Sequence, residues 1–262
     1  KWKPYNFKDQ NIDDFLQNLN IDKTVEISSI NGGYSNALKQ LNKFIDNGYE
    51  DYAKFSSNPS KEASSQLSPY FHSGQISTHE VFEKISNLES WTLESIDPKM
   101  VGRREGWWGS TENFESFMDE LITWRELGYH TCVRRANYDQ YSSLPEWAIK
   151  TLTEHSSDER EHIYSLDELT YSQTHDEIWN AAQNQLRTQG IIQNYLRMLW
   201  GKKILEWTPN PQIALSYMIT LNDRYALDGR DPNSYSGVFW ILGRYDRAWG
   251  PERSIYGKIR YM

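Results

Sequence analysis

The sequence has little of several features that mark common protein classes. Only one of its 262 residues is a cysteine, Cys132, so no disulfide can form within the chain, which is typical of a reducing compartment. No apolar run is long enough to span a membrane and no signal peptide is recognisable, so we expect neither. With one cysteine and no HExxH pair among the six histidines, we expect no metal site of the usual zinc type.

Motifs of nucleotide binding and hydrolysis are also missing. The sequence contains no GxGxxG after a strand, no GxxxxGK[ST] and no GxSxG. Hydrolysis, phosphoryl transfer and metal catalysis therefore have little support. No convincing strand pattern is found either, so we predict an all-α protein with long loops.

Aromatic residues are what the chain has in excess, with 11 Trp, 17 Tyr and 9 Phe. Trp and Tyr combine a large apolar ring with a polar tip, which suits ligand pockets, although a large aromatic core is an equally simple interpretation. The net charge of −8 argues against a surface coated with phosphate-binding residues.

The C-terminal tail, residues 243–262, differs from this acidic average. It has five cations against Asp246 and Glu252, a local charge of +3. Its basic and aromatic residues are interleaved: Arg244, Tyr245, Arg247, Trp249, Arg253, Tyr256, Lys258, Arg260 and Tyr261. This pattern suits nucleic-acid binding, and a structured tail held by ion pairs explains the composition as well.

The length is near the upper limit for a single hydrophobic core. We therefore predict an N-terminal extension or linker over residues 1–31 and one helical domain over residues 32–262. Apolar spacing predicts a clear helix over 111–129, in which Glu120 and Trp124 share a face. Thr174 is the expected N-cap of the helix that Gly190 ends, with Glu177 completing a capping box.

The helix that contains Leu196–Trp207 has an unusual composition. Trp200 and Trp207 are seven residues apart and share one face, and three cations lie between apolar positions: Arg197, Lys202 and Lys203. Such a helix is too aromatic for a plain surface element and too charged for a plain core element. It is typical of a helix that faces something other than protein on one side.

Six segments together resemble the class II cyclobutane pyrimidine dimer photolyases. In chain order they are LSPYFHSGQIS, DELITWREL, DEIWNAAQ, LRMLWGKKILEW, LNDRYALDGRDPN and GKIRYM. The resemblance implies an all-helical domain that holds FAD, the catalytic domain of that family. The family's N-terminal α/β antenna domain has no counterpart in the sequence, so we expect no antenna pigment.

The resemblance also implies a reaction. In this family a reduced flavin, excited by blue light, passes an electron to a pyrimidine dimer flipped out of DNA, and the cyclobutane ring opens. We accordingly expect a carbon–carbon lyase with DNA as its partner. We also expect an intracellular location, cytoplasmic, nucleoid or nuclear, no membrane or metal partner, and a monomer.

Residue roles follow from matched motif positions. Tyr52 resembles a flavin-contacting tyrosine, Arg197 and Asp228 resemble an ion pair beside the flavin ring, and Asn222 resembles the asparagine that faces flavin N5. Four residues resemble the loop that holds the pyrophosphate: Ser64, Ser65, Leu67 and Ser68. That loop precedes a predicted helix start, where backbone amides can bind phosphate.

Three tryptophans resemble the electron-transfer chain of the class, in the order Trp200, Trp179 and Trp207 outward from the flavin to solvent. Trp179 and Trp200 are 21 residues apart with Gly190 between them. On one straight helix they would be about 30 Å apart, too far for electron transfer, so they must lie on two packed helices.

The remaining matches concern DNA. Glu120 resembles the acid that contacts the dimer, a role that requires an apolar pocket to raise its pKa. Residues resembling the walls of the dimer pocket are Trp124, Met198 and Trp240. Residues resembling those that brace the gap left in the duplex are Arg247, Trp249 and Arg260.

An alternative is motivated by the missing antenna domain and by Ser56, and Leu199 is a further departure from the family pattern. Ser56 stands where the class usually has an arginine near the lesion, and Leu199 replaces an aromatic residue before Trp200. Both substitutions are expected to affect lesion binding and electron transfer more than FAD binding. The alternative hypothesis is a cryptochrome-like flavin photoreceptor without repair; repair of the (6-4) photoproduct is a third.

Overall fold

The computed structural model describes residues 11–103 and 105–262. Within these residues the chain is helical, and its one β-type pairing is an isolated bridge between Arg253 and Gly257. The predicted all-α fold is therefore confirmed. Across the same residues, no helix combines the length and the apolar character that crossing a membrane requires.

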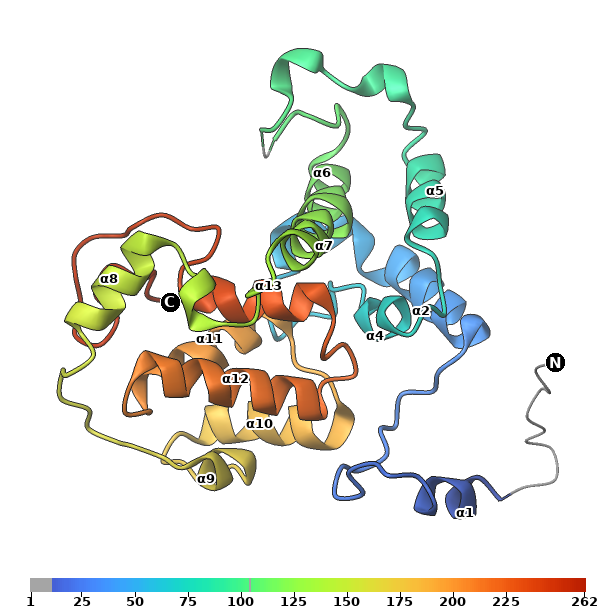
Figure 1. Ribbon diagram of the computed structural model, residues 1–262. Coiled ribbons are helices and arrows are strands. Elements are labelled where there is room, and N and C mark those ends of the chain that lie inside the picture. Colours follow the sequence, from blue (N-terminus) through green and yellow to red (C-terminus); the bar gives the residue numbers. More distant parts are fainter. Residues whose placement is uncertain (1–10, 104) are drawn as a thin grey trace.

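The first half of the chain contains short helices joined by long loops (Figure 1). They are α1 (Ile12–Gln17), α2 (Tyr34–Asn47), η1 (Tyr49–Asp51), α3 (Tyr52–Phe55), α4 (Ser68–His72), α5 (Thr78–Leu88), η2 (Leu93–Ser95), η3 (Pro98–Met100), α6 (Glu112–Met118) and η4 (Asp119–Trp124). The second half follows with α7 (Arg125–Arg134), η5 (Tyr141–Ser143), α8 (Glu146–Glu154), α9 (Leu166–Thr170), α10 (Glu177–Gln189), α11 (Asn194–Glu206), α12 (Pro211–Tyr225) and α13 (Pro232–Ile241).

These helices enclose two hydrophobic cores, one in each half of the chain. The first core comes from residues 37–121 and includes Leu41, Phe44 and Phe114. The second comes from residues 144–259 and includes Trp200 and Phe239. Figure 1 shows α7 and α13 in contact in the middle of the molecule, where they join the two cores.

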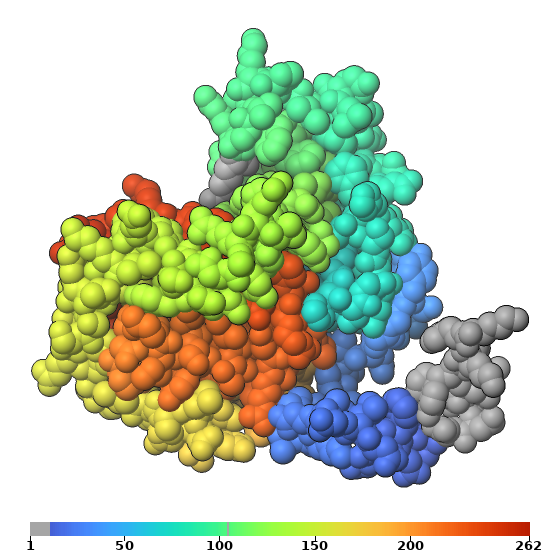
Figure 2. All heavy atoms as spheres, in the orientation of Figure 1, coloured from blue at the N-terminus to red at the C-terminus, as the bar shows by residue number. Residues whose placement is uncertain are grey.

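The described residues before α2, 11–33, contact the second half of the chain (Figure 2). Asp22 forms an ion pair with Arg224 at 2.8 Å, and the Ser28 hydroxyl donates to the Gln189 carbonyl at 2.7 Å. Of the predicted extension 1–31, the first ten residues lie outside the described part. The proposed domain boundary at residue 31 stays a prediction.

The helix predicted over 111–129 is longer than expected and changes type. It continues from α6 through η4 into α7, and η4 is a π-helix rather than an α-helix. Short π-helical segments often occur at functional sites because the wider turn moves side chains off the regular helical positions. Glu120 and Trp124 both lie in this segment.

The N-cap prediction for α10 was wrong. The capping residue is Asp176, whose carboxylate accepts from the Trp179 N–H at 2.9 Å. The Thr174 hydroxyl instead donates to the Asn180 side-chain oxygen at 2.8 Å, because that side chain reaches back over the first turn. Gly190 ends the helix as predicted, in the left-handed conformation with φ of 74°.

Candidate functional site

Three tryptophans form a continuous series of ring contacts across α10 and α11, one parallel and one edge-to-face, which we call the tryptophan stack. The rings of Trp179 and Trp200 are parallel within 2°, with centroids 6.5 Å apart, and Trp179 meets Trp207 at 5.7 Å. The Trp179 Nε1–H donates to the Trp200 carbonyl at 3.0 Å, which fixes the two helices in register. Their order in space is therefore Trp200, Trp179, Trp207, as the sequence predicts.

The outer end of this stack differs from the prediction. Trp207 was expected to reach solvent, but only 2% of its surface is exposed. Tyr164 and His175 cover it, with ring centroids 5.6 Å and 5.1 Å from the indole. The sequence does not suggest this cover, since both residues come from loops before α9 and α10.

A buried glutamine supports the inner tryptophan. Gln183 is fully buried, and its Oε1 accepts from the Trp200 Nε1–H at 2.8 Å. Sequence reasoning missed Gln183. Its position four residues after Trp179, on the same face of a helix, was the available signal.

Arg197 and Asp228 form the ion pair that the sequence predicts. The guanidinium lies 3.1 Å from the carboxylate, and both side chains are 15% exposed. Burial opposes ionisation of Asp228, but the charge of Arg197 and hydrogen bonds from Arg197 and Ser68 outweigh it, so the pKa of the Asp228 carboxyl lies below its usual range. A fixed negative charge and a fixed positive charge therefore stand next to the serine loop.

Asn222 is the predicted site residue with the clearest unmet bonding capacity. It is 2% exposed, and among the described residues no donor reaches its Oδ1. The Nε–H group of Arg197 is also buried, and among the described residues no acceptor bonds to it. Buried polar atoms of this kind are uncommon in native proteins, and a bound polar ligand is one of the ordinary explanations. An acceptor and a donor with free capacity fit the polar edge of a flavin ring.

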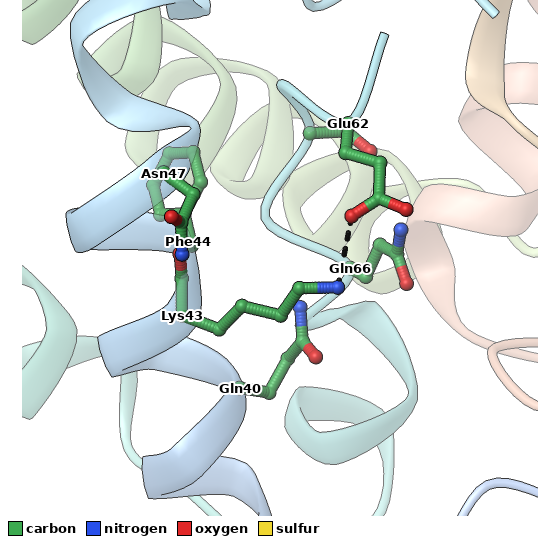
Figure 3. Close-up of a pocket in the computed structure, with 7 residues that line it drawn as sticks. Gln40, Lys43, Phe44, Asn47, Glu62 and Gln66 are labelled. Carbon is green, nitrogen blue, oxygen red and sulfur yellow. Dashed lines mark hydrogen bonds and ion pairs between the residues drawn. The ribbon is translucent and has the colours of Figure 1, made fainter. Parts of the chain in front are cut away.

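The predicted phosphate loop, residues 64–68, is braced by α2. The Gln40 amide donates to the Ser65 carbonyl at 2.9 Å, and the side chain of Leu67 within the loop is fully buried. Figure 3 shows the hollow between α2 and this loop, where Lys43 extends to Glu62 at 2.9 Å. Ser64 contributes to the lining of this hollow. The loop conformation is thus set by neighbours on α2.

Tyr52 connects the first core to the π-helical segment. Its ring packs edge-on against Phe44 at 5.7 Å and Phe117 at 5.3 Å. Burial, with the negative charges of Glu120 and Asp119, raises the pKa of the Tyr52 phenol. The phenol therefore stays neutral, and Tyr52 and Glu120 face a common region.

Glu120 does not lie in the apolar pocket that the sequence suggests. Within the described part of the chain Glu120 is exposed, because the buried residue of its segment is its neighbour Leu121. Trp124, one turn later, donates from Nε1 to the Asp119 carboxylate at 3.0 Å and meets Tyr245 at 6.1 Å. Met198 is 5% exposed and lies against Gly237 of α13.

The C-terminal tail brings four predicted DNA residues together. The Arg260 guanidinium lies 5.6 Å from the Trp240 ring and 5.1 Å from the Trp249 ring, and Arg247 lies 4.4 Å from Trp249. Both arginines are exposed. Aromatic faces that hold arginine side chains keep the cations in fixed positions at the surface.

Not every cation of the tail is available for DNA. Arg244 is 4% exposed, donates to the Tyr138 carbonyl at 2.8 Å and to the Ser143 hydroxyl, and lies over the Phe239 ring. Lys258 forms an ion pair with Glu252 at 3.2 Å. For these two cations the interpretation of a structured tail therefore holds, and nucleic-acid binding by the other cations stays a prediction. In the described residues no cluster of His, Cys, Asp or Glu is arranged to hold a metal ion.

The chain is similar to several curated proteins. A deoxyribodipyrimidine photo-lyase from Methanothermobacter thermautotrophicus is 40% identical over 250 residues, which cover 95% of this chain and 51% of that protein. A deoxyribodipyrimidine photo-lyase from Potorous tridactylus is 39% identical over 246 residues, covering 93% and 43%. The chain thus spans about half the length of the curated relatives that it matches. No protein-family model matches it.

Solved structures share its fold. A bacterial class III photolyase from Agrobacterium tumefaciens aligns with a TM-score of 0.56 at 21% identity, over 80% of this chain and 38% of that chain. A cryptochrome from Synechocystis aligns with a TM-score of 0.61 at 15% identity, over 90% and 44%. At these identities the likeness concerns the arrangement of helices alone.

Proposed function

Because the chain belongs to the photolyase and cryptochrome family, we propose that it is an FAD-dependent, light-driven lyase that repairs cyclobutane pyrimidine dimers in DNA. The observation that carries the proposal is the buried Trp200–Trp179–Trp207 stack. Trp179 of α10 joins it to Trp200 on α11, the helix that also presents Arg197 and Met198. The stack is a route for electrons, and the same helix borders the candidate flavin and DNA residues.

FAD, when bound, supplies the light absorption and the electron that opens the cyclobutane ring. The part of the protein is to hold it and set the charges around it. We assign the pyrophosphate to the loop containing Ser64, Ser65, Leu67 and Ser68. The free Oδ1 of Asn222 and the free Nε of Arg197 support contacts with the polar edge of the ring system. An amide suits that position because it can donate or accept by rotating.

On the DNA side we assign two tasks. Arg247 and Arg260, held on the faces of Trp249 and Trp240, bind phosphates and brace the duplex where the dimer has left it. Glu120 contacts the dimer and holds a proton for it, and Trp124 and Met198 are assigned to the wall of the dimer pocket. The exposure of Glu120 in the free protein requires that the dimer itself supply the apolar cover that raises the pKa of this carboxyl.

The decisive experiment is repair of a dimer-containing oligonucleotide under blue light, with reduced FAD. Purified protein should restore the intact bases, and no light-dependent loss of dimer would contradict the proposal. The Glu120→Ala variant should repair about 100-fold more slowly, the lower range of what a positioned acid or base contributes. It should retain light-driven reduction of FAD through the tryptophans.

The matched control is Glu126→Ala. Glu126 is an exposed carboxylate six residues further along the same helical run, where it pairs with Arg125 at 3.1 Å. Its removal should leave both repair and flavin reduction at the level of the unmodified protein. Equal losses of repair in the two variants would remove the special role given to Glu120.

A second candidate function is a flavin photoreceptor that does not repair DNA. Ser56 favours it, because this residue offers no charged donor to a lesion and its carbonyl is occupied by the Gln193 amide at 2.8 Å. This function predicts flavin reduction through the tryptophan stack with no repair of the oligonucleotide. The same pair of measurements therefore separates the two candidates.

A further inference from the structure

A tyrosine and two histidines cover the outer end of the tryptophan stack. His162 and His175 lie with ring centroids 3.9 Å apart, and Tyr164 stacks on His175 at 6.0 Å and on His162 at 6.1 Å. We call His162, Tyr164 and His175 the Tyr–His cluster. It touches Trp207 through the rings of Tyr164 and His175, and the Tyr164 N–H donates to the Trp207 carbonyl at 3.0 Å.

The hydrogen bonds around Tyr164 indicate to which atom its phenol O–H group donates. The Tyr164 oxygen accepts from the His175 backbone N–H at 3.1 Å, and it lies 2.7 Å from His175 Nδ1. A hydroxyl oxygen that accepts one bond still has its own proton to donate. The acceptor within reach is Nδ1, so the phenol is arranged to donate to an imidazole that can take up its proton.

Exposure increases along the same path. Trp207 is 2% exposed, Tyr164 is half-buried and His175 is exposed. A positive charge on the buried indole is costly, because little water solvates it there. A positive charge on an exposed imidazole costs far less, because water solvates it. The Glu161 carboxylate lies 3.8 Å from the neighbouring His162 ring.

We propose that His175 is the proton acceptor that allows Tyr164 to serve as the last electron donor of the stack. The proposal rests on the proposed function, in which blue-light excitation of oxidised flavin withdraws an electron from Trp200 and leaves the hole on Trp207. One electron then passes from Tyr164 to the Trp207 radical cation, and the phenol O–H proton passes to His175 Nδ1. The products are neutral Trp207, a neutral Tyr164 radical and an imidazolium at the surface, so the total charge is unchanged.

This step makes the charge separation last. The tyrosyl radical is neutral and its proton is at the surface, so return of the electron requires the proton to come back as well. The positive charge that would otherwise remain on a buried ring is transferred to solvent contact. The positive charge can thereby leave the tryptophan stack for the surface, although Trp207 itself is buried.

The test uses the full chain loaded with oxidised FAD, with radicals followed by time-resolved absorption and electron paramagnetic resonance after a blue flash. The unmodified protein should form a neutral tyrosyl radical, more slowly in D2O than in H2O. His175→Asn keeps an acceptor oxygen near the position of Nδ1 but is not a base. It should form the radical about 100-fold more slowly, as expected for loss of a positioned base, and leave the hole on tryptophan.

Two further variants complete the design. Tyr164→Phe should lose the tyrosyl signal. Tyr171→Phe, an exposed tyrosine at the end of α9, should keep the radical yield and the isotope effect of the unmodified protein. A hole that stays on tryptophan in the unmodified protein, or a His175→Asn variant with unchanged rate and isotope effect, overturns the proposal.

A measurement without flavin separates this proposal from the proposed function. Nitrogen-15 NMR of the flavin-free chain reports which ring nitrogen of His175 carries the proton. An unprotonated Nδ1 supports the proposal, and a protonated Nδ1 overturns it, since that atom could not accept from Tyr164. Absence of any radical after a flash would reject the light-driven function, while the NMR result still decides the state of His175.

Discussion

Lys202 is the most unusual single residue of the second core. Its side chain is on α11, 3% exposed, and its Nζ donates to the Ile241 carbonyl at 2.6 Å. Burial lowers the pKa of the Lys202 amine to about 7, against a smaller opposing effect from Asp246. This hydrogen bond connects α11 to the end of α13. At acidic pH the amine is charged, and a buried charge destabilises the fold.

This residue predicts a pH dependence of stability with a defined sign. The folded pKa of Lys202 lies below the unfolded value of about 10.4, so the unfolded chain binds more protons. The penalty for the buried charge is complete below about pH 7 and vanishes as the pH rises to about 10. Lys202→Met should therefore raise the melting temperature most near pH 6, and the gain should shrink by pH 9.5.

Thermal unfolding of both proteins at matched pH values checks this. Lys203→Met is the control, because it removes an adjacent cation that pairs with Glu206 at 3.1 Å and leaves Lys202 in place. It should keep the pH dependence of the unmodified protein. A gain for Lys202→Met that is the same at every pH would show that packing, and not the buried charge, is responsible.

For single residues, the sequence predicts which residues pair with each other better than it predicts how deeply each residue is buried. The pairing of Arg197 with Asp228 follows from motif positions and is observed at 3.1 Å. The burial of Arg244 and of Trp207 was not predictable, because the neighbours responsible are Tyr138 and Tyr164, 106 and 43 positions away in the chain. Charge and aromatic content are local properties of a sequence, whereas exposure depends on residues that are distant in it.

At the level of elements, the α10–α11 turn holds the tryptophan stack in register. Gly190 has φ of 74°, and a Cβ atom at this position would lie 2.6 Å from Leu227 Cγ. The Gly190 carbonyl also accepts from the Leu227 N–H at 2.8 Å, so the backbone there cannot move freely. Only glycine meets both requirements, a left-handed backbone and a close approach.

Gly190→Ala should therefore lower the free energy of unfolding by about 2 kcal/mol or more, the sum of backbone strain and a clash in a packed region. Gly74→Ala provides the control, because Gly74 has φ of 64° but open space around its Cα. It has the strain without the clash and should cost about 1 kcal/mol. Urea denaturation of the two variants measures the difference. Equal decreases in the free energy of unfolding would mean that the clash with Leu227 does not contribute to the loss of stability.

Helices were predicted correctly where the apolar residues are regularly spaced. Details of backbone geometry, such as a π-helical segment or the exact first residue of a helix, were missed. The run from Thr111 to Tyr129 reads as one α-helix, since a π-helical segment of six residues leaves the apolar pattern nearly unchanged. The start of α10 was misplaced by two residues for a similar reason. Thr174 and Asp176 are both good N-caps by residue type, and only the observed bond to the Trp179 N–H distinguishes them.

At the level of the whole molecule, the candidate site lies where the two cores meet. Ser68 of the first half bonds Asp228 of the second, and the Gln193 amide reaches the Ser56 carbonyl. His72 and Asp231 approach to 3.4 Å across the same junction. The sequence predicted the helical class, and the roles that it assigns to the site residues stay predictions. It did not predict that two cores would divide the chain, because apolar periodicity does not report which helices pack together.

The charge distribution leads to the last prediction, on DNA binding. The chain has a net charge of −8, so phosphate binding must be confined to a local surface. Arg247 and Arg260 are exposed cations that lie against the Trp249 and Trp240 rings. Each phosphate contact releases counterions, which contributes about one to the slope of log affinity against log salt concentration.

Arg247→Gln and Arg260→Gln should each reduce that slope by about one, and the double variant by about two, for a dimer-containing duplex titrated between about 50 and 200 mM salt. Arg253→Gln is the matched control: this exposed arginine of the same tail lies over Tyr261 at 4.3 Å, apart from Trp240 and Trp249. Its slope should equal that of the unmodified protein. If Arg253→Gln lowers the slope as much as the other two, DNA binding depends on the net charge of the tail, and the location of Arg247 and Arg260 beside Trp240 and Trp249 has no part in it.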